Sequence, residues 1–292
     1  MWSNVNLRLH FIVLLWGFSG VLGKLISIEA VPLVFWRTLI AVIAIYVMVR
    51  AAGISLQVSR RLLLQFLGVG VIIAVHWYLF FGAIKVSNVS VALSTMATGA
   101  FFSALLEPLF FKTKLKPYEL LLALLVMACL WLIFQASPEY WLGILMGVGC
   151  SLLSALFSIL NAKLQRVHAP RKIMFYEMLG AFLCTFVVML ASGNMHMLYP
   201  LPTMDWVWLL VLGTLITAFP MIESVNLLKH ISPFSLLLAV NLEPVYGIIL
   251  AYFIFGESEQ MSPVFYAAAM VMVLVIILNA IIKHREKKRA TL

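Results

Sequence analysis

Long apolar runs alternate with short polar stretches along the whole chain. The runs cover residues 9–28, 31–49, 62–84, 88–111, 118–135, 140–161, 171–192, 205–227, 233–255 and 263–282. Each run is close to the ~20 residues that an α-helix needs to cross a bilayer, and none shows the alternation of a transmembrane β-strand. The pattern therefore predicts an all-α membrane protein with ten transmembrane helices and little chain left for a soluble domain.

The composition supports the same class. Of 292 residues, 64% are hydrophobic and 11% are charged, with a mean hydropathy of +1.09. A water-soluble chain of this size could not cover its surface with so few polar residues. The three cysteines, Cys129, Cys150 and Cys184, fall inside apolar runs, so we interpret them as small buried side chains and expect neither a disulfide, a metal site nor another cofactor.

The basic residues predict how the chain lies in the membrane. If the amino terminus is cytoplasmic, every Lys and Arg except Lys24, Arg37 and Lys85 falls in a cytoplasmic loop or in the basic tail at residues 283–292. The positive-inside rule then predicts a multi-pass protein of the cytoplasmic (inner) membrane with both termini in the cytoplasm. The net charge of +9 needs no nucleic acid partner to explain it, because the tail can lie near anionic membrane lipids.

The second half of the chain repeats the first. A shift of 144 residues places Lys85 on Lys229, Leu93 on Leu237, Leu106 on Leu250 and Phe111 on Phe255, and a similar shift places Arg37 on Glu177. A repeat of five spans ends on the opposite side of the membrane, so its copy enters upside down. We expect two inverted five-helix repeats, residues 1–136 and 137–282, a construction typical of alternating-access transporters.

Several local patterns resemble one family. They are Trp16-Gly17-Phe18-Ser19 followed by Lys24, Pro32 with Phe35-Trp36-Arg37, and Leu242-Glu243-Pro244-Val245 leading to Phe255-Gly256-Glu257 and Ser262-Pro263. Together with the five-plus-five spans, they resemble the EamA-like family of the drug/metabolite transporter superfamily over essentially the whole chain. The resemblance implies export of amino acids and related small metabolites, or movement of other polar solutes.

Glu243 and Pro244 lie at the centre of the apolar run 233–255. A carboxylate at that depth in lipid costs at least ~2.5 kcal/mol, so it must face a partner, a proton or a water-filled path. Glu243 is therefore a candidate for binding a solute amine or a proton, with Pro244 as a hinge. The alternative is that Glu243 only holds the kink that Pro244 introduces.

Further candidates for a solute cavity lie on other predicted helices. They are His76, Trp77 and Tyr78 in one run and Trp16 and Ser19 in the first, with Thr98 in a small-residue stretch. Neighbouring residues on a helix point in different directions, so Trp77 and Tyr78 are weaker candidates than His76. Packing between helices is the alternative for each of them.

Two charged residues and a proline inside predicted helices are further candidates, with Arg37 about two turns inside its helix. Arg37 could bind an anionic solute group or form a structural ion pair. Glu223 follows Pro220 near the expected cytoplasmic mouth, which makes Glu223 a second candidate for proton coupling and Pro220 a second hinge.

The function predicted from these observations is secondary-active or facilitative export of small polar metabolites by alternating access, in a protein that is not an enzyme. Nucleotide-sugars or other anionic solutes are an alternative. They would require clustered cations, and only Arg37 and Lys24 are available, so a zwitterionic or neutral solute fits better.

An intramembrane serine protease is an alternative of another class, because Gly17-Phe18-Ser19-Gly20 matches the pattern of such enzymes. The match is weak, since no histidine has a protease-like setting. The expected partners are a small-molecule substrate and membrane lipids, and a monomer is compatible with the pattern. Substrate identity, direction and energy coupling stay open.

Overall fold

The computed structural model describes residues 4–112 and 117–290 of the chain. The longer elements are the helices α1 (Val5–Leu25), α2 (Ala30–Ala51), α3 (Arg60–Val86), α4 (Val89–Met96), α5 (Gly99–Phe111), α6 (Pro117–Ala136), α7 (Trp141–Leu164), α8 (Pro170–Ala191), α9 (Thr203–Gly213), α10 (Phe219–Leu227), α11 (Pro233–Val240), α12 (Glu243–Phe255) and α13 (Pro263–Ala290). Short 3-10 turns η1 (Pro138–Tyr140), η2 (Asn194–Leu198) and η4 (Gly256–Glu259) and the π-turn η3 (Thr214–Ala218) connect them. The described residues contain no strand, so the all-α prediction is confirmed for them.

Every predicted apolar run contains one or two helices in the structure. Within the described residues, eight helical segments are long and apolar enough to cross a membrane, while α6 and α13 contribute the shorter apolar stretches Leu124–Ala136 and Pro263–Val275. The chain is thus a multi-pass membrane protein, and the count of ten crossings stays a prediction for α6 and α13. The backbone of α13 continues as helix to Ala290, so most of the predicted tail at 283–292 extends the last helix; residues 291–292 lie outside the described part.

Two of the spans are broken at equivalent positions. The fourth consists of α4 and α5 and the ninth of α11 and α12, and each has two residues between its pieces. Moving the boundaries of α4 and α5 by 144 residues, from 89, 96, 99 and 111, gives 233, 240, 243 and 255, which are the boundaries of α11 and α12. The internal repeat that sparse identities predicted is therefore visible in the backbone.

The two broken spans also pack as an inverted repeat requires. The first piece of one contacts the second piece of the other, α4 with α12 and α5 with α11. This pairing arises when the two spans run side by side in opposite directions. Their breaks consequently meet in the middle of the bundle.

Different chemistry produces the two breaks. At the second, Pro244 has no amide hydrogen, so the carbonyl of Val240 cannot receive the usual helical bond and the helix restarts at Glu243. At the first there is no proline. There the hydroxyl of Thr95 donates to the carbonyls of Val91 and Ala92 at 2.9 and 3.0 Å, and that of Thr98 donates to the carbonyl of Thr95 at 2.7 Å. Side-chain bonds of this kind compete with backbone bonds and bend helices.

The eighth span contains the other predicted hinge. The helix α9 ends at Gly213, the π-turn η3 follows, and Pro220 lies at the start of α10. A π-turn adds one residue to a helical turn and redirects the side chains beyond it. Thr217, which belongs to this turn, is fully buried inside the bundle.

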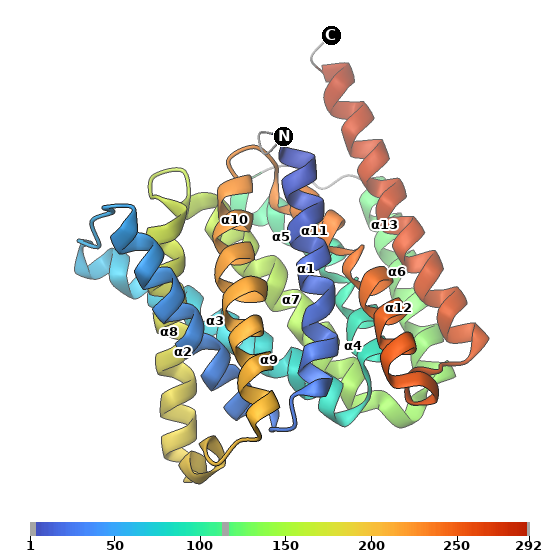
Figure 1. Ribbon diagram of the computed structural model, residues 1–292. Coiled ribbons are helices and arrows are strands. Elements are labelled where there is room, and N and C mark those ends of the chain that lie inside the picture. Colours follow the sequence, from blue (N-terminus) through green and yellow to red (C-terminus); the bar gives the residue numbers. More distant parts are fainter. Residues whose placement is uncertain (1–3, 113–116, 291–292) are drawn as a thin grey trace.

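The helices group around α3, which packs against α7 and α8, while α2 packs on α8 and α1 on α12. Figure 1 shows α2 and α8 on one side of the bundle, α6 and α13 at the other edge, and α1, α7 and α10 between them. The start of α1, the end of α10 and the end of α13 lie toward the same end of the bundle, which we call the termini end.

Glycines allow α3 and α8 to approach each other closely. A Cβ added at Gly70 of α3 would lie 2.1 Å from the Glu177 carbonyl oxygen, and one added at Gly180 of α8 would lie 2.5 Å from the Leu67 carbonyl oxygen.

This contact predicts the effect of a single methyl group. Gly70→Ala should destabilise the protein by about 1–3 kcal/mol, because its methyl group would overlap backbone atoms of α8 that cannot move aside as a side chain can. Gly68→Ala on the same helix is the matched control, since no atom lies within 4 Å of its added Cβ. The midpoint of unfolding in detergent, followed by circular dichroism, measures both. Equal midpoints for the two variants would contradict the close α3–α8 contact.

Candidate functional site

A pocket lies at the centre of the bundle, where both repeats contribute to its wall. Its polar lining consists of Ser19 on α1, Arg37 on α2, His76 on α3, Ser154, Ser158 and Asn161 on α7, Ser224 on α10 and Glu243 on α12. Trp16, Trp77, Phe80 and Met96 add apolar surface. The cavity measures about 60 Å³, which is room for a few water molecules, so a larger solute would require the wall to move.

Arg37 enters this pocket with almost no exposure to solvent. Its Nε donates to the Thr217 hydroxyl at 2.7 Å, and a longer contact of 3.5 Å joins Nη1 to the Ser19 hydroxyl. Its guanidinium carbon lies 4.0 Å from the centroid of the Trp77 ring, a cation–π arrangement. Arginine has five N–H donors, so part of the guanidinium remains available to a ligand.

The predicted structural ion pair of Arg37 is wrong for the described part of the chain. The ion pairs between Arg8 and Glu223 and between Lys24 and Glu259 do not involve Arg37. The charge of Arg37 is instead stabilised by a hydroxyl and an aromatic face. Thr217 was not predicted, because its position depends on the π-turn η3, which no sequence pattern signals.

Glu243 is the first residue of α12 and is 5% exposed. Its carboxylate lies at a helix amino terminus, where unpaired backbone N–H groups and the helix dipole favour a negative charge. Within the described residues, Glu243 has no ion-pair partner, and Arg37 is the cation whose charge acts on it. The pocket therefore contains one basic and one acidic side chain that form no ion pair with each other.

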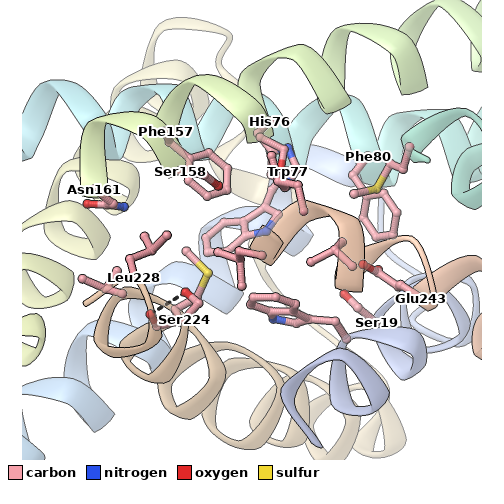
Figure 2. A pocket seen from close by; sticks show the side chains of 18 of the residues that line it. Ser19, His76, Trp77, Phe80, Phe157, Ser158, Asn161, Ser224, Leu228 and Glu243 are labelled. Carbon is pink, nitrogen blue, oxygen red and sulfur yellow. Dashed lines mark hydrogen bonds between the residues drawn. The ribbon is translucent and has the colours of Figure 1, made fainter. Parts of the chain in front are cut away.

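Of the three candidates on α3, His76 and Trp77 line the pocket, whereas Tyr78 lies on the outer surface. His76 Nδ1 lies 2.8 Å from the Cys150 carbonyl oxygen, and the His76 ring packs edge-on against Phe157. A carbonyl only accepts hydrogen bonds, so Nδ1 carries the proton and Nε2 is left as an acceptor. Figure 2 shows His76 and Trp77 above the middle of the pocket, with Asn161 and Glu243 toward opposite ends. Tyr78 is 44% exposed and is absent from the wall, as expected of a residue that follows two inward-facing neighbours.

Two further predicted residues lie outside the pocket wall. Thr98 is fully buried, but its hydroxyl is 2.5 Å from that of Ser151 on α7, so it joins helices instead of facing a solute. Glu223 forms an ion pair with Arg8 of α1, and its neighbour Ser224 lines the pocket in its place. Trp16 and Ser19 line the wall, and Pro244 and Pro220 lie where their helices restart.

A polar face of α7 was overlooked in the sequence. Ser154, Ser158 and Asn161 recur at intervals of four and three residues and therefore share one side of the helix, which faces the pocket. This spacing of polar residues can be recognised in the sequence of the apolar run 140–161. Ser158 also corresponds to Ser19 in the repeat, and both line the pocket.

Polar contacts join the helices toward both ends of the bundle. At the end opposite the termini, the buried carboxylate of Glu259 accepts hydrogen bonds from Lys24 Nζ at 2.7 Å, the Val89 amide at 3.1 Å and the Ser90 amide at 2.9 Å. This ties the turn η4 to α1 and α4. At the termini end, Arg8 pairs with Glu223, and Gln165 Nε2 donates to the Leu228 carbonyl at 3.0 Å.

Comparisons with known proteins were consistent with this architecture. The sequence profile of the EamA-like transporter family matches residues 7–135 and 141–282. A solved structure described as "Crystal structure of protein" is similar to the chain with a TM-score of 0.70 and 16% sequence identity, covering 95% of this chain and 98% of that one. Such low identity shows a shared fold alone. No curated protein matches the chain.

The polar face of α7 predicts which positions water reaches. With Cys129, Cys150 and Cys184 replaced by alanine, a cysteine at Ser158 should react with a small water-soluble thiol reagent in membranes, because it faces the pocket. A cysteine at Ser151, seven residues earlier on the same helix, should react at least about tenfold more slowly, because its side chain packs against Thr98. Mass spectrometry of the labelled protein over time measures both rates. Similar rates would contradict a hydrated pocket at Ser158.

Proposed function

The chain belongs to the EamA-like transporter family, and from this premise we propose that it moves small zwitterionic metabolites such as amino acids across the membrane by alternating access. The observation that carries this proposal is the separated pair of Arg37 and Glu243 in one central pocket. A solute carboxylate would bind the free N–H groups of Arg37. A solute ammonium would bind Glu243, and the Ser19 hydroxyl, 3.5 Å from Nη1 of Arg37, lines the same pocket.

The apolar part of the pocket supports a small organic solute. Trp16, Trp77, Phe80 and Met96 line the wall beside the charged groups. Aromatic rings and methionine offer broad, adaptable contacts to apolar side chains. A solute that carries both charges and a modest apolar group matches this combination.

The charge balance of the pocket disfavours the anionic alternatives. Among the described residues of the wall, Arg37 is the only Lys or Arg, and Glu243 lines the same space. Lys24, the second candidate cation, pairs with Glu259 toward the end opposite the termini. A nucleotide-sugar or another solute with several negative charges would therefore meet one cation and one repelling carboxylate.

The geometry gives no support to a serine protease either. Ser19 contacts Arg37, which cannot act as a base, while His76 Nδ1 is bonded to the Cys150 carbonyl oxygen. In the described part of the chain, no hydrogen bond joins Ser19 to a histidine. Without such a bond the hydroxyl is not activated for attack.

Alternating access is proposed because the central pocket is small and distinct polar contacts join the helices on either side of it. Opening one end would break the Lys24–Glu259 contacts and opening the other the Arg8–Glu223 pair. We propose that the protein lies in the cytoplasmic (inner) membrane, with both termini in the cytoplasm as the positive-inside pattern predicts. We propose that it exports its solute as a monomer.

Glu243 is the proposed proton-coupling residue in the pocket. Glu223, toward the termini end of the bundle, is the second proposed proton-coupling residue.

The central test is solute counterflow in proteoliposomes, screened with radiolabelled amino acids, their decarboxylated amines and the corresponding keto acids. The wild type should exchange compounds that carry both charges and neither single-charge analogue. Glu243→Gln should reduce uptake at low solute concentration by about 10- to 100-fold, since a hydrogen bond to a charged group contributes about 1.5–3 kcal/mol. Glu257→Gln, which alters an exposed carboxylate on η4, is the matched control and should retain uptake.

The same assay with an imposed pH gradient separates function from scaffold. If Glu243→Gln leaves both the flux and its pH dependence unchanged, Glu243 only supports the helix break. If amines or keto acids exchange as well as amino acids, the zwitterion proposal fails while transport itself stands.

The contacts of Glu259 make a second prediction. Glu259→Gln should raise the reactivity of a cysteine at Ser158 toward a membrane-impermeant reagent added from the side opposite the termini. The physical reason is that a neutral amide holds Lys24 and the α4 amino terminus less strongly, and each 1.4 kcal/mol lost shifts the open population about tenfold. Glu257→Gln again serves as the control, measured as the rate of labelling from each side. Unchanged labelling would show that these contacts do not control access.

A further inference from the structure

A buried acid–amide pair lies directly behind the pocket wall. Glu177 on α8 is fully buried, and its Oε2 accepts a hydrogen bond of 3.0 Å from Asn161 Nδ2 on α7. Asn161 lines the pocket, where Figure 2 shows it at one end, whereas Glu177 is not part of the wall. The amide therefore stands between the pocket and the carboxyl group.

Both residues also have one unsatisfied oxygen. Glu177 Oε1 and Asn161 Oδ1 are buried and have no hydrogen-bond partner among the described residues. Both atoms are acceptors when Glu177 is ionised. An ionised carboxylate without a counter-charge in this setting would cost several kcal/mol.

No charged neighbour compensates Glu177. The helices α2, α3 and α10 and the turn η2 pack against α8, and α7 contributes Asn161. Their charged or titratable side chains are Arg37, Tyr46 and Arg50 on α2, Arg60, Arg61, His76, Tyr78 and Lys85 on α3, Cys150 and Lys163 on α7, Glu223 on α10 and His196 on η2. Of the described side chains, only Asn161 makes a polar contact with the Glu177 carboxyl group.

One proton satisfies both unpaired oxygens at once. A proton on Glu177 Oε1 turns the carboxyl group into a donor toward Asn161 Oδ1, while Asn161 Nδ2 continues to donate to Oε2. The two groups then form a closed ring of two reciprocal hydrogen bonds. The charge disappears, and neither buried oxygen is left without a partner.

We propose that Glu177 and Asn161 form a proton-binding site, separate from Glu243, that gains or loses its proton through the pocket. A water or solute group that engages Asn161 from the pocket opens the ring, and the proton passes from Glu177 Oε1 to water in the pocket. Closing the ring requires a proton to return to the same oxygen. Proton binding stands on the geometry alone; its coupling to solute movement rests on the proposed transport function.

Infrared spectroscopy of the full chain in liposomes at neutral pH tests proton binding without any solute. The probe is the C=O stretch of protonated carboxyl groups, recognised by its shift in D₂O. The wild type should have such a band that is absent from Glu177→Gln, and Glu243→Gln should retain it. Glu177→Gln should fold, because a glutamine amide keeps both bonds of the ring. If the band is missing in the wild type or persists in Glu177→Gln, the proposal is overturned.

Asn161→Leu gives an independent test should Glu177→Gln fold poorly. Leucine removes both hydrogen bonds, so the carboxyl band should move to higher frequency, while Ser154→Ala on the same face of α7 should leave it in place. A band at the same frequency in Asn161→Leu would refute the ring.

Transport assays separate the two proposals. With an amino acid identified by counterflow, Glu177→Gln should retain counterflow but show a smaller acceleration by an imposed pH gradient than the wild type, because only the proton site at Glu243 then remains. Acceleration undiminished in Glu177→Gln would refute the coupling. Failure of wild-type counterflow would refute the proposed function and leave the infrared result standing.

Discussion

The cost of burying charge in a membrane protein governs how this structure is built. Arg37, Glu177, Glu243 and Glu259 are all buried, yet only Glu259 has an ion pair among the described residues. In hydrocarbon an uncompensated charge costs several kcal/mol. Each of the other three must therefore be stabilised by a hydroxyl and an aromatic face, a helix amino terminus, a bound proton or a ligand. These requirements concentrate polar chemistry in the middle of the bundle.

The internal repeat supplies matching positions that the two halves use differently. Both break one span after its first eight residues, one with Pro244 and the other with hydroxyl bonds from Thr95 and Thr98. The equivalent residues Arg37 and Glu177 carry opposite charges; one enters the pocket and the other lies behind its wall. Symmetry thus provides a scaffold that can interconvert between two similar shapes, while the differences in sequence give the pocket its polarity.

The sequence predicted most of the architecture because hydrophobic length is a direct signal of a membrane helix. It also identified Glu243, Arg37, His76, Trp77, Trp16 and Ser19, all of which line the pocket, since a polar or amphipathic group in an apolar run needs a reason to be there. Thr98 and Tyr78 were misplaced because helix rotation and hydroxyl pairing depend on neighbouring helices. The partnership of Arg37 with Thr217 could not be predicted, since it depends on a π-turn, and the break at Thr98 lacks the proline that would have marked it.

The separation of Arg37 and Glu243 is as important as their presence. If the two groups formed a buried ion pair, a solute would have to break it, and the loss would offset much of the binding energy. Arg37 is held by the Thr217 hydroxyl and the Trp77 ring, and Glu243 at the start of α12 forms no ion pair with it, so each group keeps one direction free. A zwitterion can satisfy both groups together, whereas a solute with a single charge leaves the other group buried and uncompensated. The pocket therefore selects its solute by penalising the wrong one as well as by attracting the right one.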